Sequence, residues 1–407
     1  MIQAIKAKII VTPGHAPIKD SAVIVKNNII EKIIPSTELK NNYYQIIDLK
    51  NSVVLPGFIN SHIHLELHWV QKLLEPFKSF PSWLNQIIKL KKNFNNSKIP
   101  YWVNKSLNEC INSGVTTIGE ISSYDGLDYK PILDKKIRAV YFYELTNSTL
   151  KNIENKFFQS LIRNKTNPLI NFRIFPHSIY SLDTKSLKRI LAFAKKHNIK
   201  LGMHLSESID EVKYSKRKRN NFEKEVFPKT SYKPTIETKP TTPLEYLDTL
   251  NRNRQHITLI HMNNLSQNDF KILTKKEYPV IICPRSNLYL NQKLPNIKFF
   301  MNYMKTGLGT DGLSSNLSIN FLDEINFLYL NAKKIINNPE EKILSIATIG
   351  GAKALGIDNE VGTIEKGKKA DIIAFDLLNK NPYLSIIHSK KRNLKMSMIN
   401  GKIIKLR

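Results

Sequence analysis

LPGFINSHIHLE, residues 55–66, begins as an apolar run and ends in two histidines, His62 and His64. Residues two apart on a β-strand project to the same side, so both imidazoles can bind one metal ion. A strand whose two histidines have only structural roles would give the same sequence. The stretch therefore predicts a strand ending in a candidate metal site, and it leaves both interpretations open.

Seven more short apolar runs follow, and helix-like segments separate them. The runs are VTTIGE, RAVYFYEL, NFRIFPHS, KLGMHLS, HITLIHMN, PVIICPRS and TGLGTDG. Repeated βα units predict a parallel sheet, and several runs carry polar residues directly after the strand, which in a barrel is the catalytic face. The 407 residues suit two or three average domains, or one (β/α)8 barrel with a small added domain. We predict an α/β protein whose (β/α)8 TIM-type barrel spans residues 56–359.

Both chain ends differ in pattern from the middle. Residues 1–55 alternate short β-branched runs with Gly, Pro and Asn turns, and residues 360–407 repeat this in GTIEKGKKADIIAFDL and MSMINGKIIKL. Such strand–turn–strand patterns are typical of small antiparallel sheets. We therefore predict one small β-sandwich domain built from both termini, with the barrel inserted between them.

Polar residues also follow later strands of the predicted barrel. His177 follows NFRIFP, His204 and Glu207 follow KLGM, His261 follows ITLI, and Asp311 follows TGLGT. Each alone is more often a hydrogen-bonded structural residue, but the rim of one barrel can collect them all. The other histidines lack this context and are expected on the surface or in packing; they are His15, His68, His197, His256 and His388.

The formal charge of +28 first suggests a nucleic acid or an anionic membrane as partner. Lysines are scattered over nearly every segment, however, and the one dense run, residues 213–219 (KYSKRKR), is too short to form a binding face. We therefore expect a solvated basic surface and neither a nucleic-acid nor a membrane partner. A non-catalytic, basic nucleic-acid-binding protein is the alternative.

Neither a membrane span nor a secretory leader is expected. No stretch reaches the ~18 apolar residues that cross a bilayer, and the first residues lack the apolar region of a signal peptide. Cys110 and Cys283 lie far apart and outside any paired-cysteine motif, so no disulfide framework is expected. These features favour the cytoplasm.

The ordered motifs resemble the amidohydrolase superfamily, in its branch of metal-dependent aminohydrolases that act on purines and their nucleosides. The motifs, which cover nearly the whole chain, are PGFINSHIH, SGVTTIGE, PHSIYS, MHLSES, IHMNN, CPRSN, GTDGLSSN and GTIEKGKKADIIAFD. In that family they follow successive barrel strands, and the last returns the chain to a β-sandwich domain. The resemblance implies the fold that the strand pattern predicts.

The resemblance also implies roles for single residues. The implied metal ligands are His62, His64, His204 and Asp311. Acid/base and water-binding work falls to Glu207, His261 and Asp311, and substrate contacts to His177, Ser315 and Asn316. Binuclear relatives carry a carboxylated lysine after the fourth strand, where this chain reads FPHSIYS, so one divalent ion is implied. Zinc and ferrous iron both suit such a site.

This ligand set implies hydrolytic removal of a ring amino group. A divalent ion lowers the pKa of bound water from about 15.7 to about 7. Asp311 then accepts the water proton, Glu207 protonates the adjacent ring nitrogen, and His261 holds the attacking oxygen. The other zinc deaminase design, H-x-E with P-C-x-x-C, is absent from the sequence.

Within this branch the chain is most similar to 6-amino-6-deoxyfutalosine deaminases, which belong to the futalosine route to menaquinone. The similar segments are HIHLEL, FPSWL, SGVTTIGEISS, MHLSESIDE and TDGLSSNLSINFLDE. Glu66, on the strand face of the metal pair, is expected to bind a substrate hydroxyl or amine or to form a salt bridge. Trp83 is expected to stack on an aromatic ring or to anchor its helix. The alternative substrates are adenosine, methylthioadenosine and S-adenosylhomocysteine, and a different leaving group is a further alternative.

Aminodeoxyfutalosine carries a carboxyphenyl group, for which a pocket should supply a cation or several amide donors. Arg138, Arg173 and Arg285 are candidates by position, although a structural ion pair is the favoured interpretation of each. The long basic segment 212–247 is either a lid over the site or a surface excursion. The expected partner is thus a small nucleoside. A homodimer is compatible with the sequence, which does not reveal the oligomeric state.

Overall fold

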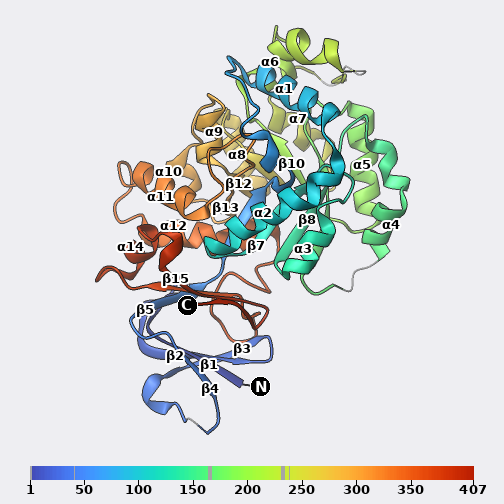
Figure 1. The fold of residues 1–407 in the computed structure, drawn as a ribbon. Coiled ribbons are helices and arrows are strands. Elements are labelled where there is room, and N and C mark those ends of the chain that lie inside the picture. Colours follow the sequence, from blue (N-terminus) through green and yellow to red (C-terminus); the bar gives the residue numbers. More distant parts are fainter. Residues whose placement is uncertain (1, 41, 164–166, 231–233, 238) are drawn as a thin grey trace.

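The structure, a computed structural model, describes residues 2–40, 42–163, 167–230, 234–237 and 239–407 (Figure 1). A barrel of parallel strands wrapped by helices forms the larger part, and a separate sheet lies below it in Figure 1. Strands from both chain ends build this separate sheet. The predicted (β/α)8 barrel with a small β-domain made from both termini is therefore confirmed.

The barrel strands follow one another around the sheet in chain order, each parallel to its neighbours. They are β6 (Phe58–Ile63), β7 (Val115–Ser122), β8 (Arg138–Leu145), β9 (Ile170–Pro176), β10 (Leu201–Leu205), β11 (Ile257–His261), β12 (Val280–Ile282) and β13 (Thr306–Leu308). At the seam between the first and last strands, the Asp311 N–H donates to the His62 carbonyl at 3.1 Å. The Asn60 side chain exchanges hydrogen bonds of 2.8 and 3.0 Å with Thr310. These bonds nearly close the barrel.

Alternate residues of the barrel strands face opposite sides, as the period of a strand requires. Val140, Ile260 and Ile281 share one apolar cluster, which fills the barrel. Their chain neighbours Ala139 and Leu259 belong to the larger cluster between the strands and the surrounding helices. The near-continuous apolar runs of the sequence thus reflect strands that are buried on both faces.

Helices cover the outside of the barrel (Figure 1). They are α1 (Phe80–Asn93), α2 (Ile99–Asn112), α3 (Tyr129–Lys135), α4 (Lys156–Arg163), α5 (Thr184–Lys196), α6 (Ile209–Ser215), α7 (Pro243–Leu250), α8 (Gln267–Lys276), α9 (Pro284–Tyr289), α10 (Ile297–Phe300), α11 (Phe321–Ala332), α12 (Glu340–Ser345), α13 (Gly351–Leu355) and α14 (Pro382–Ile387). Short 3-10 and π segments are η1 (Ser36–Glu38), η2 (Leu65–Val70), η3 (Asn96–Lys98), η4 (Leu150–Glu154), η5 (Phe222–Val226), η6 (Phe227–Lys229), η7 (Ile346–Gly350) and η8 (Lys391–Asn393). None of the helices in the described ranges combines the length and the apolar character needed to cross a membrane.

Local hydrogen bonds fix the first residue of helix α1, which borders the candidate site. The Ser79 hydroxyl accepts a hydrogen bond from the Ser82 N–H, and the Ser82 hydroxyl accepts one from the Ser79 N–H, each at 3.1 Å. This capping box satisfies two backbone donors that have no partner within a helix. Pro81 in the first turn has the φ angle that a helix needs.

The terminal sheet joins the two chain ends through one pair of strands. In spatial order it contains β16 (Lys402–Leu406), β15 (Leu394–Ile399), β14 (Ile372–Asp376), β5 (Ser52–Pro56), β1 (Ile2–Ile10), β2 (Ile18–Lys26) and β3 (Ile29–Pro35), and β4 (Gln45–Asp48) pairs with β1. Strand β5, which leads into the barrel, lies antiparallel to β14, which leaves it. Ile5, Val23, Ile372 and Met396 share the core of this sheet.

A buried ion pair ties the barrel to the terminal sheet, and its removal should destabilise the protein. Arg138, at the start of β8, donates to Asp371 at 2.8 and 3.1 Å, and both side chains are almost fully buried. Arg138→Met leaves the Asp371 charge buried and unpaired, so we expect a loss of about 3–5 kcal/mol in the free energy of unfolding. Denaturant titration measures it. Lys130→Met, which breaks an exposed pair on α3, serves as control; equal midpoints for both variants would contradict the prediction.

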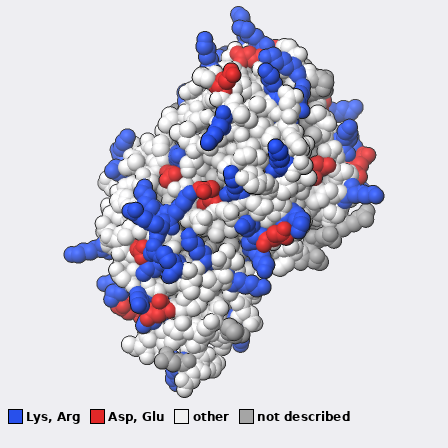
Figure 2. Space-filling view, in the orientation of Figure 1, with Lys and Arg blue, Asp and Glu red and all other residues white. Residues whose placement is uncertain are grey.

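Basic side chains are spread over the face of the molecule in Figure 2, with acidic groups among them. The dense run of residues 213–219 begins in the last turn of α6 and continues past its end. This distribution agrees with a solvated basic surface. The expectation that the protein binds no nucleic acid stays a prediction.

Candidate active site

The four predicted metal ligands converge at one end of the barrel. His62 and His64 lie at the end of β6, His204 lies near the end of β10, and Asp311 follows β13. The His62 Nε2 lies 3.3 Å from the His204 Nε2 and 3.5 Å from the Asp311 Oδ1, and the His64 Nε2 lies 3.6 Å from the same oxygen. Ligand atoms around a tetrahedral zinc ion, with bonds of about 2.05 Å, stand about 3.3 Å apart. The donor set therefore fits one divalent ion.

The protonation of these groups also suits a metal. Burial lowers the pKa of His64 and of His204 well below the usual range of an imidazole. Burial alone would raise the pKa of the Asp311 carboxyl, but its hydrogen bond to His62 and the nearby histidine charges hold that pKa well below its usual range. His64 and His204 are thus neutral and Asp311 is ionised, which are the forms that bind metals.

The backbone around Asp311 turns its carboxylate towards the histidines. Asp311 has a φ of 58°, in the left-handed region that residues other than glycine seldom adopt. Its Oδ1 accepts from the Gly312 N–H at 2.9 Å, and its Oδ2 accepts from the Ser286 hydroxyl at 2.6 Å. Gly309 allows β13 to approach β6, because a Cβ there would lie 2.8 Å from the Cβ of His62. Strained backbone of this kind is concentrated at functional sites.

Glu207 and His261 form a second pair beside the metal donors. The Glu207 Oε1 lies 3.4 Å from the His261 Nε2, and the His261 Nδ1 lies 3.1 Å from the Asn287 Oδ1. The Asn287 Nδ2 donates to Asn263, so the Asn287 oxygen faces the ring and the His261 Nδ1 carries the proton. Burial, and then the charge of Asp311, raises the pKa of Glu207 well above its usual range, while burial lowers the pKa of His261 to about 4. The raised pKa favours the protonated form of Glu207, which can donate a proton, beside a neutral imidazole.

A cavity of about 470 Å³ opens over these groups. Its polar end is lined by His64, His204, Glu207, His261 and Asp311. One face of α1 forms an apolar wall with the side chains of Phe80, Trp83, Leu84, Ile87 and Ile88. A concave site of this size, mostly apolar with a few convergent polar groups, is typical of small-molecule binding.

Trp83, His177 and Ser315, which were predicted to contact the substrate, line this cavity. The Trp83 Nε1 donates to the Ser314 carbonyl at 2.7 Å, so the indole anchors α1 and also forms part of the cavity wall. The His177 Nε2 lies 3.9 Å from the Glu144 Oε1, and burial lowers the pKa of this histidine. The three side chains are therefore placed where a ligand can reach them.

Glu66 and Asn316 do not belong to the described wall of the cavity. The expectation that Glu66 shares the strand face of the metal pair is wrong, because β6 ends before it and Glu66 lies in η2. Its carboxylate accepts from the Ser123 N–H and hydroxyl, each at 2.8 Å, and it forms no ion pair with a described residue. The Asn316 Nδ2 donates to the Thr310 carbonyl at 2.8 Å. Both side chains thus form hydrogen bonds to backbone near the site, Glu66 at Ser123 and Asn316 at Thr310.

Part of the long segment 212–247 forms another wall of the cavity. Its residues in contact with the cavity are Val226, Phe227, Thr230 and Pro234. Residues 231–233 and 238 of this segment lie outside the described residues. The segment therefore borders the site instead of projecting away from it, and its opening as a lid stays a prediction.

A comparison with known families agrees with this arrangement. The sequence profile of the amidohydrolase family matches residues 53–404. The chain belongs to the amidohydrolase family. This amidohydrolase is 28% identical over 403 residues to the 5′-deoxyadenosine deaminase of Methanosphaera stadtmanae, which covers 95% of the chain and 88% of the relative.

Two solved structures share the fold of this amidohydrolase. Aminofutalosine deaminase of Helicobacter pylori, in complex with methylthio-coformycin, superposes with a TM-score of 0.84 at 23% identity and covers 98% of this chain and 99% of its own. An adenosine deaminase of Xanthomonas campestris with bound zinc gives a TM-score of 0.83 at 20% identity, over 99% of this chain and 92% of its own. At these identities the likeness establishes the fold.

Sequence reasoning gave no role to Glu211, which positions Glu207 in this amidohydrolase. The Glu211 carboxylate accepts from the backbone N–H groups of Ser206 and Glu207 at 3.0 and 2.8 Å. The Asn264 side chain donates to the Glu207 carbonyl at 2.9 Å. The sequence does indicate a helix start here, because Ser208 and Glu211 have the S-x-x-E spacing of a capping box.

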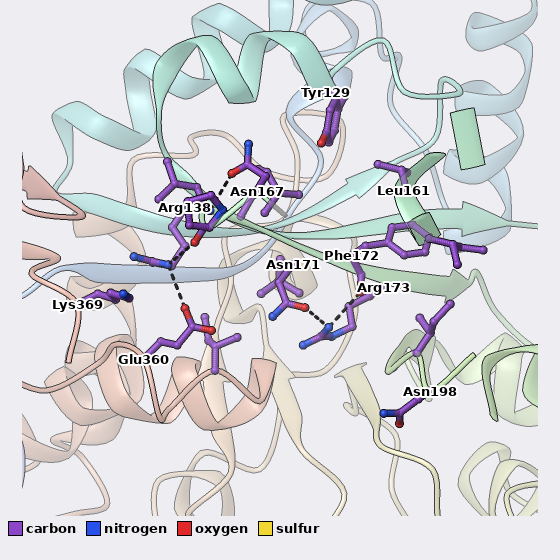
Figure 3. Close-up of a pocket in the computed structure, with 18 residues that line it drawn as sticks. Tyr129, Arg138, Leu161, Asn167, Asn171, Phe172, Arg173, Asn198, Glu360 and Lys369 are labelled. Carbon is purple, nitrogen blue, oxygen red and sulfur yellow. Dashed lines mark hydrogen bonds and ion pairs between the residues drawn. The ribbon is translucent and has the colours of Figure 1, made fainter. Parts of the chain in front are cut away.

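The three arginines considered for an anionic substrate group are absent from the described wall of the active-site cavity. Arg138 and Arg173 line a separate cavity of about 440 Å³ (Figure 3). Arg138 pairs with Glu360 at 3.3 Å and Arg285 lies 3.8 Å from Glu324, which confirms the structural ion pairs expected for them. Arg173 differs, because it donates to a neighbouring backbone carbonyl at 3.0 Å and forms no ion pair with a described residue. An anionic group on the substrate would therefore have to bind a residue other than these three arginines.

Proposed function

We propose that this amidohydrolase removes the 6-amino group of an adenine nucleoside by hydrolysis and releases ammonia. The observation that carries the proposal is the position of the Glu207 carboxyl, which stands against His261 and beside the metal donors in one cavity. Deamination of a ring needs activated water on the reacting carbon and a proton for the ring nitrogen. The names of the relatives, deaminases of adenosine and 5′-deoxyadenosine, support the same reaction.

Each residue of the site has a separate task in this proposal. The donors His62, His64, His204 and Asp311 would hold a divalent ion, because His62 lies within 3.5 Å of His204 and of Asp311, and His64 lies 3.6 Å from Asp311. When bound, such an ion lowers the pKa of water from about 15.7 to about 7. Asp311 accepts a proton from the attacking water, Glu207 protonates the ring nitrogen beside the amino-bearing carbon, and His261 holds the attacking oxygen. The proton held by Asp311 passes to the amino group, the C–N bond breaks and ammonia leaves. The ring carbonyl forms as the added hydroxyl returns its proton to Glu207.

We propose one divalent ion per chain. The chain carries His177 after the fourth barrel strand, where binuclear relatives place a bridging lysine. Three imidazoles and one carboxylate suit both zinc and ferrous iron. Metal analysis of the freshly purified protein is expected to find about one equivalent, and two equivalents would contradict a single-ion site.

Asn287 should matter for turnover although it touches no metal donor. Its oxygen receives the Nδ1 proton of His261, which fixes the ring that faces Glu207. We expect Asn287→Ala to lower kcat about tenfold to a hundredfold, the usual effect of removing a group that orients an active-site histidine. Steady-state kinetics measure the loss, with the exposed Asn359→Ala as control. Equal activity in the two variants would show that His261 needs no such support.

We further propose aminodeoxyfutalosine as the substrate, converted to futalosine in menaquinone biosynthesis. The segments HIHLEL, FPSWL and MHLSESIDE support this choice. The cavity also continues along α1 beyond Trp83, which leaves room for a group attached to the nucleoside. Deamination of 5′-deoxyadenosine is the second candidate, because the relative from Methanosphaera stadtmanae carries that name.

A comparison of substrates tests both candidates. The purified, metal-loaded protein is incubated with aminodeoxyfutalosine, 5′-deoxyadenosine, adenosine, methylthioadenosine and S-adenosylhomocysteine, and the adenine absorbance and ammonia are followed together. We expect the highest kcat/KM for aminodeoxyfutalosine, with one ammonia for each ring converted. A higher value for 5′-deoxyadenosine selects the second candidate, and absence of ammonia from all five refutes deamination. The cytoplasmic location and the homodimer stay predictions.

A further inference from the structure

The face of α1 that lines the active-site cavity is apolar along most of its length and ends in a lysine. In chain order its side chains are Phe80, Trp83, Leu84, Ile87, Ile88 and Lys91, with the spacing of one helical face. The bond to Ser314 fixes Trp83 close to Asp311. Lys91 follows eight residues later, about 12 Å further along the helix axis. This wall therefore leads from the metal donors to a cation.

Lys91 and Lys92 line the cavity, and neither forms an ion pair with a described carboxylate. The Lys91 Nζ donates to the Ser123 hydroxyl at 2.8 Å, and that hydroxyl in turn donates to Glu66. The same ammonium lies 4.5 Å from the centre of the Tyr124 ring. The Lys92 Nζ donates to the Lys229 carbonyl at 3.5 Å. An ammonium group has three N–H donors, so both lysines keep donors for a ligand.

Two of the three carboxylates that line the cavity, Glu207 and Asp311, lie with the metal donors. Among the described residues that line it, the acids are Glu144, Glu207 and Asp311. Each lies beside a histidine, with carboxylate-to-Nε2 distances of 3.9, 3.4 and 3.5 Å respectively. A ligand along α1 thus meets Glu207, Asp311 and imidazoles at one end and an apolar wall in the middle. At the other end it meets the ammonium groups, with Glu144 of β8 next to Ser123 and beside His177.

We propose that Lys91, assisted by the exposed Lys92, binds an anionic group at the end of an apolar 5′ substituent of the nucleoside. An aryl or short alkyl group fits against Leu84, Ile87 and Ile88, and a terminal carboxylate accepts hydrogen bonds from Lys91. This inference rests on the proposed nucleoside deamination, which places the ring at the metal end. It makes the two lysines the residues that select a carboxylated arm over the bare 5′-deoxy group.

The selectivity is measured as the ratio of kcat/KM for aminodeoxyfutalosine to kcat/KM for 5′-deoxyadenosine. Lys91→Met keeps the apolar stem and removes the charge, so we expect the ratio to fall about tenfold, through KM. Lys91→Arg should restore most of the ratio, and Lys92→Met should lower it less because Lys92 is exposed. Lys89→Met, at an exposed position of α1 away from the cavity, is the matched control. An unchanged ratio in Lys91→Met overturns the inference.

A binding measurement separates this inference from the proposed reaction. Calorimetry compares the affinity of the metal-loaded protein for futalosine with that for inosine, which lacks the aryl carboxylate, and requires no turnover. We expect futalosine to bind at least about tenfold more tightly, with an advantage that Lys91→Met removes and that salt weakens. Equal affinities in the unaltered protein overturn the inference even if deamination is proven. A lysine-dependent preference without any ammonia release refutes the proposed function and leaves the anion site standing.

Discussion

His62→Ala is expected to lower kcat/KM for any adenine nucleoside by at least about a thousandfold. The His62 Nε2 lies between the His204 Nε2 and the Asp311 Oδ1, at 3.3 and 3.5 Å, so alanine removes the central donor of the set. With that donor the ion is lost, and the activation of water is lost with it. The metal content should fall from about one equivalent to almost none. Elemental analysis and kinetics on the same preparation measure both effects.

His15→Ala is the control for this variant, because His15 is exposed and its Nε2 lies 3.7 Å from Glu365, in the terminal sheet region. It should retain the metal and the activity of the unaltered protein. If His62→Ala keeps about one equivalent of metal and more than about a tenth of the activity, the four-donor site is incorrect.

Glu207→Gln is expected to lower kcat about a thousandfold and to leave the metal content unchanged. Glutamine keeps the size of the side chain and its contact with His261, but it has no proton to give to the ring nitrogen. General acid catalysis contributes about a hundredfold to ten-thousandfold. Burial raises the pKa of Glu207 and so favours its protonated form, which is the form that the amide cannot replace. Ammonia release under substrate saturation gives kcat.

Glu154→Gln, at a surface position, is the matched control for the same chemical change. It should leave kcat within about twofold, in line with surface substitutions away from special features. A Glu207→Gln variant that kept a third of the activity would remove Glu207 from the chemistry. Loss of metal in that variant would instead indicate that Glu207 supports the donor set.

The sequence predicted the barrel and the convergence of the proposed metal donors because both depend on local patterns. The run FINSHI forms the fully buried strand β6, and His62 and His64 lie at its end. Helix α13 ends at Leu355 because Gly356, directly after it, adopts a positive φ, which glycine does readily. Strand ends meet at one rim of a barrel, so the convergence of separate donors follows from the fold class.

Residues whose role depends on tertiary contacts escaped prediction. The strand period places Glu66 on the face of the metal pair, but the chain leaves β6 and turns into η2 before it. Lys91 is one of many lysines in the sequence, and only the docking of α1 over the cavity distinguishes it. Three arginines were candidates for the anionic group by their position in the sequence, yet Arg138 stabilises the junction with the terminal sheet.

The seam between β6 and β13 joins parts of the chain that are synthesised far apart in time, which decides when the proposed metal site would be complete. Asn60 and Thr310, which bond across the seam, are 250 residues apart, and the last donor, Asp311, follows directly. A nascent chain that still lacks this part offers the metal two or three imidazoles without the carboxylate, and no closed barrel to hold them in place. Full affinity arises only when the last strand docks on the first, because metal binding and folding are coupled. In the proposed site, loading would thus be confined to nearly finished chains, and an ion held there would join the earliest barrel strand to the latest.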